Sequence, residues 1–176
     1  MNANRPQTRR QTAPAAGFAN PAHDHDLCID DALRQADEVC RQQGARLTEQ
    51  RRRVLELVWQ SHRPIGAYEI LDRLADADGR RAAPPTVYRA LDFLLEQGLI
   101  HRIESRNAFI GCSHPGSNHV VEILLCDHCG RAAEVSDHAV ARAVEATAAQ
   151  LGFTIERHTI EIAGRCGDCQ PAATDA

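Results

Sequence analysis

Two Cys-x-x-Cys pairs, Cys126/Cys129 and Cys166/Cys169, carry the most specific chemistry in this sequence. Each pair stands where a strand is expected to end. Four thiolates that meet at one point bind zinc tetrahedrally, so this spacing favours a structural zinc site. The alternatives are a redox pair, two separate disulfides, or unrelated core cysteines. Because the stretch between the pairs is longer than a simple zinc ribbon needs, strands and a helix must fold within it.

Composition describes the kind of protein that holds these thiols. The chain has 176 residues, of which 43% are apolar and 4% aromatic, which predicts one or two small domains with aliphatic cores. No stretch approaches the roughly 18 apolar residues of a membrane span, and the N-terminus lacks the apolar segment of a signal peptide. We therefore expect a cytoplasmic protein that does not enter a membrane. In that reducing compartment the seven cysteines would stay available as metal ligands.

The charge distribution indicates two domains. The formal net charge of −4 argues against a general nucleic-acid binder, but the charge is unevenly spread. Arginines outnumber acidic residues between residues 44 and 109, whereas acidic residues outnumber arginines from residue 110 onward. The boundary between the two domains is therefore expected near residue 110.

Helical periodicity dominates the N-terminal half after residues 1–25, which lack it and are expected to form a disordered tail. Four helices are predicted: residues 27–43, a second from an N-cap at Thr48 to Pro64, residues 67–76, and a fourth from Pro84 to Gly98. The first helix is expected to bury Leu27, Leu33, Ala36, Val39 and Cys40. The fourth is expected to bury Val87, Ala90, Leu91, Leu94 and Leu95, with Thr86, Arg89 and either Asp92 or Phe93 outside that face.

A β-hairpin is predicted after the fourth helix, with strands at 99–103 and 108–110 and a polar turn at 105–107. Helices followed by such a hairpin describe a winged helix-turn-helix. That module lays its recognition helix in the major groove of DNA and places the wing and flanking helices on phosphates. Arg89, on the helix that begins at Pro84, is then the best candidate for a base contact.

The C-terminal part is expected to be a mixed sheet with one helix on it. Strands are predicted at 119–125 and 154–162, and a helix begins at Val135 and ends at Gly152. The helix should cover the sheet, and the sheet could extend across a partner subunit. The overall fold class is α+β, a winged helix-turn-helix followed by a small α/β domain.

Several segments together resemble the ferric uptake regulator family of metal-sensing repressors: RLTEQRRRVLELV at 46–58, AYEIL, PPTVYRALDFLLEQGLI and the paired Cys-x-x-Cys. The resemblance covers residues 28–170 and is closest to the zinc uptake regulator branch, because His101, Cys112 and His119 follow at that branch's spacing. It implies a homodimer that binds an inverted-repeat operator in double-stranded DNA and represses metal-uptake genes when metal-loaded. The implied domains are 26–110 for DNA binding, a hinge at 111–113, and 114–176 for dimerisation and metal binding.

The resemblance also implies functional residues, with two zinc ions expected per subunit. The sensory zinc site would use His101, Cys112, His119 and Glu134, and the structural site would use Cys126, Cys129, Cys166 and Cys169. Two imidazoles, a thiolate and a carboxylate suit tetrahedral zinc better than Fe(II). Taken singly, His101 and His119 could be ordinary wing and surface residues. The DNA contacts would be Tyr68, Thr86, Tyr88 and Arg89, with Arg51 and Arg52 on phosphates.

The positions of the sensory residues suggest a mechanism. His101 belongs to the DNA-binding module, Cys112 to the hinge, and Glu134 to the dimerisation domain. A metal held by all of them would fix a hinge that otherwise samples many angles. A third site, formed by Glu122 with His138 or His158, is less favoured than solvated or supporting roles for these residues.

Three other functions are weighed against zinc-dependent regulation. An iron or peroxide sensor of the same family is the nearest, and the Cys112 and His101 pair argues against it. A thiol-disulfide oxidoreductase or a redox-regulated chaperone would use the thiols differently, but neither explains a winged helix. We do not expect an enzyme, because no second activated group accompanies the thiols.

Overall fold

The computed structural model describes residues 18, 25–78, 83–117, 120–135, 138–156 and 158–171. The predicted disordered tail, residues 1–25, lies outside this part except for Phe18 and His25. The predicted ligand His119 also lies outside the described residues.

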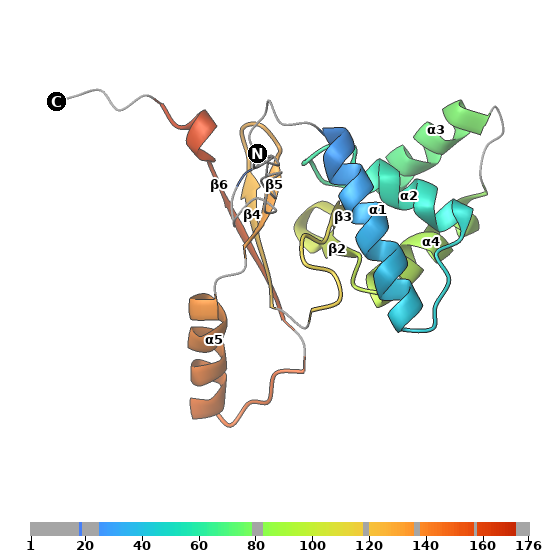
Figure 1. Cartoon of the computed structure of the whole chain (residues 1–176). Helices are drawn as coiled ribbons and strands as arrows, with labels where there is room; N and C mark the ends of the chain where they lie inside the picture. The colour runs from blue at the N-terminus through green and yellow to red at the C-terminus, as the bar shows by residue number, and fades with distance from the viewer. Residues whose placement is uncertain are drawn as a thin grey trace, which may run out of the picture.

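Four helices form the N-terminal half (Figure 1): α1 His25–Gln42, α2 Glu49–Trp59, α3 Ala67–Asp78 and α4 Pro84–Glu96. Two of them end at Gly44 and Gly98, whose φ angles of 66° and 63° lie in the left-handed region that glycine adopts readily. Their apolar faces share one core, whose most buried members include Val54, Leu55, Val58, Ile70, Leu74, Val87, Leu91 and Leu94. The four predicted helices are therefore confirmed.

One residue of the predicted buried helix faces, Leu27, was wrongly placed. Leu27 is 58% exposed, because α1 lies against its neighbours only from its second turn onward, where Ala32, Ala36, Val39 and Cys40 are buried. Of the two residues left open on the fourth helix, Asp92 is exposed and Phe93 is buried, and the guanidinium of Arg51 lies over the Phe93 ring at 3.4 Å from the centroid. A cation above the ring lets this position face α2 instead of solvent.

The predicted hairpin is present as β2 Ile100–Ile103 and β3 Ala108–Gly111, joined by a single 3-10 turn, η1, Glu104–Arg106. A two-residue strand, β1 Ile65–Gly66, pairs with β3, so the sheet order is β1-β3-β2 and every pairing is antiparallel. The N-terminal half is thus a winged helix, as the sequence predicts. The sequence did not reveal β1, because two residues are too short to show alternation.

The second sheet contains β4 Val121–Cys126, β5 Ala132–Val135 and β6 Thr159–Gly164, in the order β5-β4-β6. Strand β4 pairs antiparallel with β5 and parallel with β6, so the sheet is mixed, as expected. The prediction that a helix begins at Val135 was wrong: this residue ends β5, and the helix α5 spans His138–Gln150.

Helix α5 does not cover the second sheet, contrary to the prediction. Figure 1 shows it beyond one end of β4 and β6 instead of on their face. Leu151 is 79% exposed and Phe153 67% exposed just after the helix. An apolar helix face left open in this way is typical of a surface that another chain covers.

The wing and the second sheet pack against each other. Ile103 and Ile110 of the wing share a buried cluster with Ile123, Leu125 and Ala132 of the second sheet. The wing therefore lies between the helices and the second sheet (Figure 1). None of the described helices is long and apolar enough to cross a bilayer.

Candidate metal centres

The four cysteines of the Cys-x-x-Cys pairs lie together. Cys126 ends β4, Cys129 follows in the turn to β5, and Cys166 and Cys169 follow β6. Because β4 and β6 are parallel neighbours, with Cys126 opposite Gly164, both pairs come to the same end of the sheet. The four sulfur atoms all lie within 4.8 Å of one another.

The cysteines remain free thiols, which disfavours the disulfide alternatives. The sulfurs of Cys129 and Cys166 are 3.8 Å apart, far beyond the about 2.05 Å of a disulfide bond. The backbone N–H of Cys166 points at the sulfur of Cys126 from 3.4 Å. Gly130 follows the first pair with a φ of 74°, which folds the chain back over Cys126. This is the arrangement of a metal knuckle.

The electrostatics of this cluster call for a cation. Backbone N–H groups of Cys129 and Cys166 lower the pKa of Cys126, and the guanidinium of Arg131 lowers the pKa of Cys129. Burial and the neighbouring sulfurs instead raise the pKa of Cys169 to about 12. The four groups cannot all ionise side by side without a positive partner, and four thiolates at this separation match the ligand set of structural zinc.

Arg131 is a functional residue that the sequence analysis missed. Its Nε donates to the sulfur of Cys129 at 3.3 Å, and its Nη2 donates to the sulfur of Cys166 at 3.4 Å and to Asp168 at 2.5 Å. The ring of Phe18 lies 5.9 Å from this guanidinium. The only sequence signal was its position two residues after Cys129. Arg131 bridges one thiol from each pair.

We expect Arg131→Ala to speed the loss of zinc from the four-cysteine cluster by about tenfold, because groups that hydrogen-bond to metal ligands contribute about 10- to 100-fold to metal affinity. The measurement is the rate of zinc transfer to a chromogenic chelator. Arg165→Ala is the matched control, since Arg165 adjoins Cys166 in sequence but is exposed. Equal rates in the two variants would contradict the bridging role.

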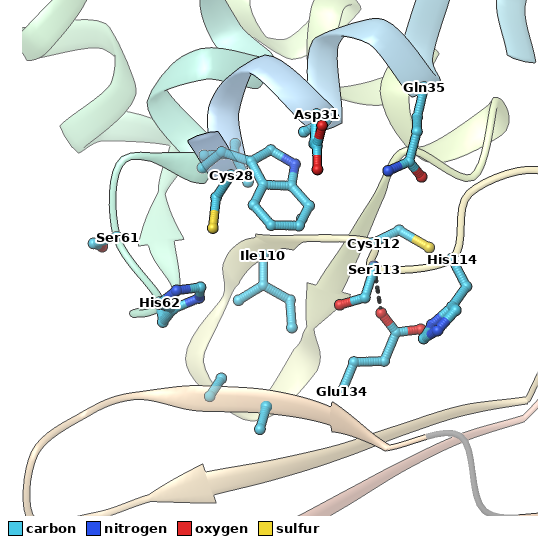
Figure 2. Close-up of a pocket in the computed structure, with 16 residues that line it drawn as sticks. Cys28, Asp31, Gln35, Ser61, His62, Ile110, Cys112, Ser113, His114 and Glu134 are labelled. Atoms are coloured by element: carbon cyan, nitrogen blue, oxygen red, sulfur yellow. Dashed lines mark hydrogen bonds between the residues drawn. The ribbon is translucent and has the colours of Figure 1, made fainter. Parts of the chain in front are cut away.

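A second cluster joins the two sheets. His101 from β2, Cys112 just after β3, and Glu134 from β5 place one ligand atom each within 4.8 Å of the others. The Nε2 of His101 is 3.2 Å from Oε1 of Glu134, and the backbone N–H of Ser113 donates to Oε2 of the same carboxylate at 2.7 Å. In Figure 2, Cys112 and Glu134 reach this junction from opposite sides.

Local packing determines where Cys112 lies. A Cβ atom on Gly111 would be 2.1 Å from the Trp59 ring, so only glycine lets α2 approach the end of β3 this closely.

A cavity of about 130 Å³ lies beside the cluster between α1, the end of α2 and β5, and Cys28 and His62 line the side of it away from Cys112 and Glu134 (Figure 2). Cys28 is half-buried there, whereas Cys40 is a core residue.

The second cluster is also built for a cation. Burial and the negative charge of Glu134 raise the pKa of Cys112 to about 12, although a backbone N–H at His114 opposes this. Glu134 itself is buried. A buried thiol, carboxylate and imidazole within ligand distance form a mixed donor set that suits zinc. Three of the four predicted sensory residues are thus brought together, and the fourth, His119, is outside the described part of the chain.

The predicted DNA contacts fall into two groups. Thr86, Tyr88 and Arg89 are exposed on α4, and Tyr68, 75% exposed, stands at the start of α3 on the rim of a depression that Tyr88 also lines. Arg51 and Arg52 instead contact the protein itself: Arg51 covers Phe93 and donates to the carbonyl of Arg46, and Arg52 pairs with Asp37 of α1. Their phosphate contacts stay a prediction.

Known proteins resemble this chain over most of its length. The sequence model of the ferric uptake regulator family matches residues 42–163. The zinc uptake regulation protein of Escherichia coli strain K12 is 41% identical over 138 residues, which cover 78% of this chain and 80% of that protein.

Solved structures agree in fold. A zinc uptake regulator complexed with zinc and DNA has a TM-score of 0.74 at 40% identity, covering 80% of this chain and 94% of that one. The crystal structure of holo XcZur has a TM-score of 0.72 at 43% identity, covering 80% of this chain and 97% of that one. With the family match spanning well over half of its residues, this chain belongs to the ferric uptake regulator family.

Proposed function

We propose that this protein is a zinc-responsive DNA-binding regulator that represses zinc-uptake genes as a homodimer when zinc is bound. The observation that carries the proposal is the cluster of His101, Cys112 and Glu134, because it joins the winged helix to the second sheet. The similarity to zinc uptake regulators supports zinc as the metal and DNA as the partner. We propose that it acts as a regulator and not as an enzyme.

Two sites would hold zinc in each subunit. Cys126, Cys129, Cys166 and Cys169 form the structural site, and His101, Cys112 and Glu134 form the sensory site with His119 as the fourth ligand. All-thiolate sites are typical of structural zinc, and the mixed donor set, which joins the two domains, is the one placed to report on zinc supply.

The sensory residues would control how the two domains are oriented. Zinc, when bound, supplies the positive charge that a thiolate and a carboxylate can share. His101 belongs to the wing and Glu134 to the second sheet, so holding both at ligand distance fixes one domain against the other. Moving a two-state hinge from mostly open to mostly closed takes about 5.5 kcal/mol of differential binding. The free energy of zinc coordination by protein ligands is large enough to supply this difference.

The raised pKa of Cys112 leads to a pH dependence of zinc affinity at the sensory site. In the metal-free protein the thiol keeps its proton at every pH below about 12, and this proton must leave when the sulfur becomes a ligand. We therefore expect affinity to rise by about tenfold per pH unit above neutrality, because one proton leaves the Cys112 thiol for each zinc ion bound. Competition with a fluorescent zinc chelator between neutral and mildly alkaline pH measures this. An affinity independent of pH would contradict it.

Helix α4 would read the operator from the major groove. Thr86, Tyr88 and Arg89 are exposed on it. We expect Arg89→Ala to weaken operator binding by about 1 to 3 kcal/mol and binding to random DNA much less. Fluorescence anisotropy with both duplexes measures the two losses, with Arg142→Ala on α5 as the control. Equal losses on both duplexes would make Arg89 a backbone contact.

The homodimer would form through the C-terminal half. The apolar residues Val140, Val144, Leu151, Phe153 and Ile155 line one open face of α5 and the segment after it. Strand β6 is an edge strand, and its Ile162 is exposed. An exposed apolar face beside an open sheet edge is suited to pair with a second copy of itself.

A metal titration tests the proposed function. Operator affinity of the metal-free protein is measured while zinc, iron(II) or manganese(II) is added, and we expect tight binding only with zinc. A response to iron(II) alone would overturn the proposal in favour of an iron sensor. Disulfide-reductase and hydrolase assays on the zinc-loaded protein test the redox and enzyme alternatives, and turnover in either would count against a pure regulator.

A further inference from the structure

The tip of the wing is bound by a carboxylate of the second sheet. Oε1 of Glu161, in β6, accepts the backbone N–H of Glu104 at 2.6 Å, and its Oε2 accepts the backbone N–H of Ser105 at 3.2 Å. These N–H groups belong to the first two residues of η1, so they have no hydrogen-bond acceptor within the turn itself. One side chain thus caps a turn that lies 57 and 56 residues away in sequence.

The electrostatics of Glu161 agree with this contact. Partial burial would raise its pKa, but the hydrogen bonds from Ser105 and Glu104 and the charge of Arg106 lower it on balance. The carboxylate is therefore held in its ionised form, which accepts both N–H groups.

Two further contacts reach the second sheet from the same wing. Arg106, also in η1, donates to Asp127 in the β4–β5 turn at 2.9 Å. Behind the tip, Ile103 and Ile110 are buried against Ile123 and Leu125. Polar contacts at the tip and an apolar contact behind it fix both the position and the rotation of the wing, and none of these residues belongs to either metal cluster.

We propose that Glu161 and Arg106 form a latch that docks the wing tip on the second sheet and sets the zinc concentration at which the sensory site closes. This rests on the proposed function and deepens it. In a winged helix-turn-helix the wing is expected to contact DNA phosphates. In this protein the backbone N–H groups of the wing tip and the side chain of Arg106 contact the second sheet, so the wing connects the two domains.

The latch and the sensory cluster favour the same orientation of the two domains. His101 lies on β2, which leads directly into η1, so docking the tip brings His101 toward Glu134 before any metal arrives. The zinc ligands are therefore partly preorganised, and less of the binding energy is used for closure. The ion pair of Arg106 with Asp127 is solvent-accessible and can open into water at small cost, which keeps the switch reversible.

Glu161→Gln and the double variant Glu161→Gln with Arg106→Ala test the latch. The matched control is Glu104→Gln, which removes a carboxylate from the same tip whose partner is Arg102 on the wing itself. Free zinc at half-maximal operator binding is measured with a metal buffer, together with zinc content and thermal stability. We expect the half-maximal zinc concentration to rise about threefold in the single variant and about tenfold in the double variant. The control and the operator affinity at saturating zinc should stay unchanged.

The possible outcomes are distinct. If the wild-type protein does not respond to zinc at all, the proposed function fails. If it responds and both latch variants respond at the same zinc concentration as the wild type, the latch is overturned while the proposed function stands. A loss of affinity at saturating zinc in the double variant but not in Glu161→Gln would place Arg106 on DNA, which also overturns the latch. One structural zinc per subunit and unchanged melting in the variants would show that they are folded.

Discussion

Cys126→Ser should leave the second sheet unable to fold and should abolish the homodimer. Cys126 is fully buried at the end of β4, and its cluster ties the β4–β5 turn to the segment after β6. Structural zinc in small domains contributes on the order of 10 kcal/mol, as much as the whole stability of a typical domain. Without a fourth thiolate, the strands are ordered only by their packing against the wing, since α5 does not cover their face.

Circular dichroism, zinc content and sedimentation measure this effect. We expect the variant to lose strand signal, to lose its structural zinc and to sediment as a monomer or aggregate, while α1 to α4 stay helical around their own core. Cys28→Ala is the control, because Cys28 is in neither cluster. A Cys126→Ser protein that remains a stable dimer with full zinc content would show that the four thiols do not organise this half.

Cys112→Ser should keep the fold, the dimer and the structural zinc but lose the response of DNA binding to zinc. The substitution is nearly isosteric at a buried position, so the local packing is retained. A serine hydroxyl is a far poorer zinc ligand than a thiolate. We expect at least about 100-fold more zinc to be needed for operator binding, which exceeds the effect of losing a supporting group alone.

His114→Ala is the matched control for this prediction. His114 lines the same cavity, two residues from Cys112, and could be mistaken for a ligand (Figure 2). The control should bind one structural and one sensory zinc and respond normally. If His114→Ala loses the response while Cys112→Ser keeps it, the ligand set is different from the one proposed. Anisotropy in zinc-buffered solution and metal analysis distinguish the two results.

Local signals account for what could be predicted from the sequence. Helices α2 to α4 repeat apolar residues at helical spacing and begin or end at Thr48, Pro84 and Gly98, so their existence follows from local energetics. The hairpin follows from two short apolar runs around a polar turn. Strand β5 was missed because Ala132 to Val135 contains no clear alternation, and Val135 fitted a helical pattern equally well.

The sequence by itself determined which atoms can bind metal. Thiols at two-residue spacing, and the imidazole, thiol and carboxylate of His101, Cys112 and Glu134, are chemical facts that any fold must accommodate. The same is true of the helical module that carries Arg89.

Only the tertiary structure decided which distant groups meet. The contact of His101 with Glu134 spans 33 residues, that of Arg131 with Cys166 spans 35, and that of Glu161 with the wing tip spans 57. The physical reason is that periodicity along a chain reports which side of an element is buried, but not what it is buried against. Pairing across β4 and β6 and the packing of the wing on the second sheet supplied that information.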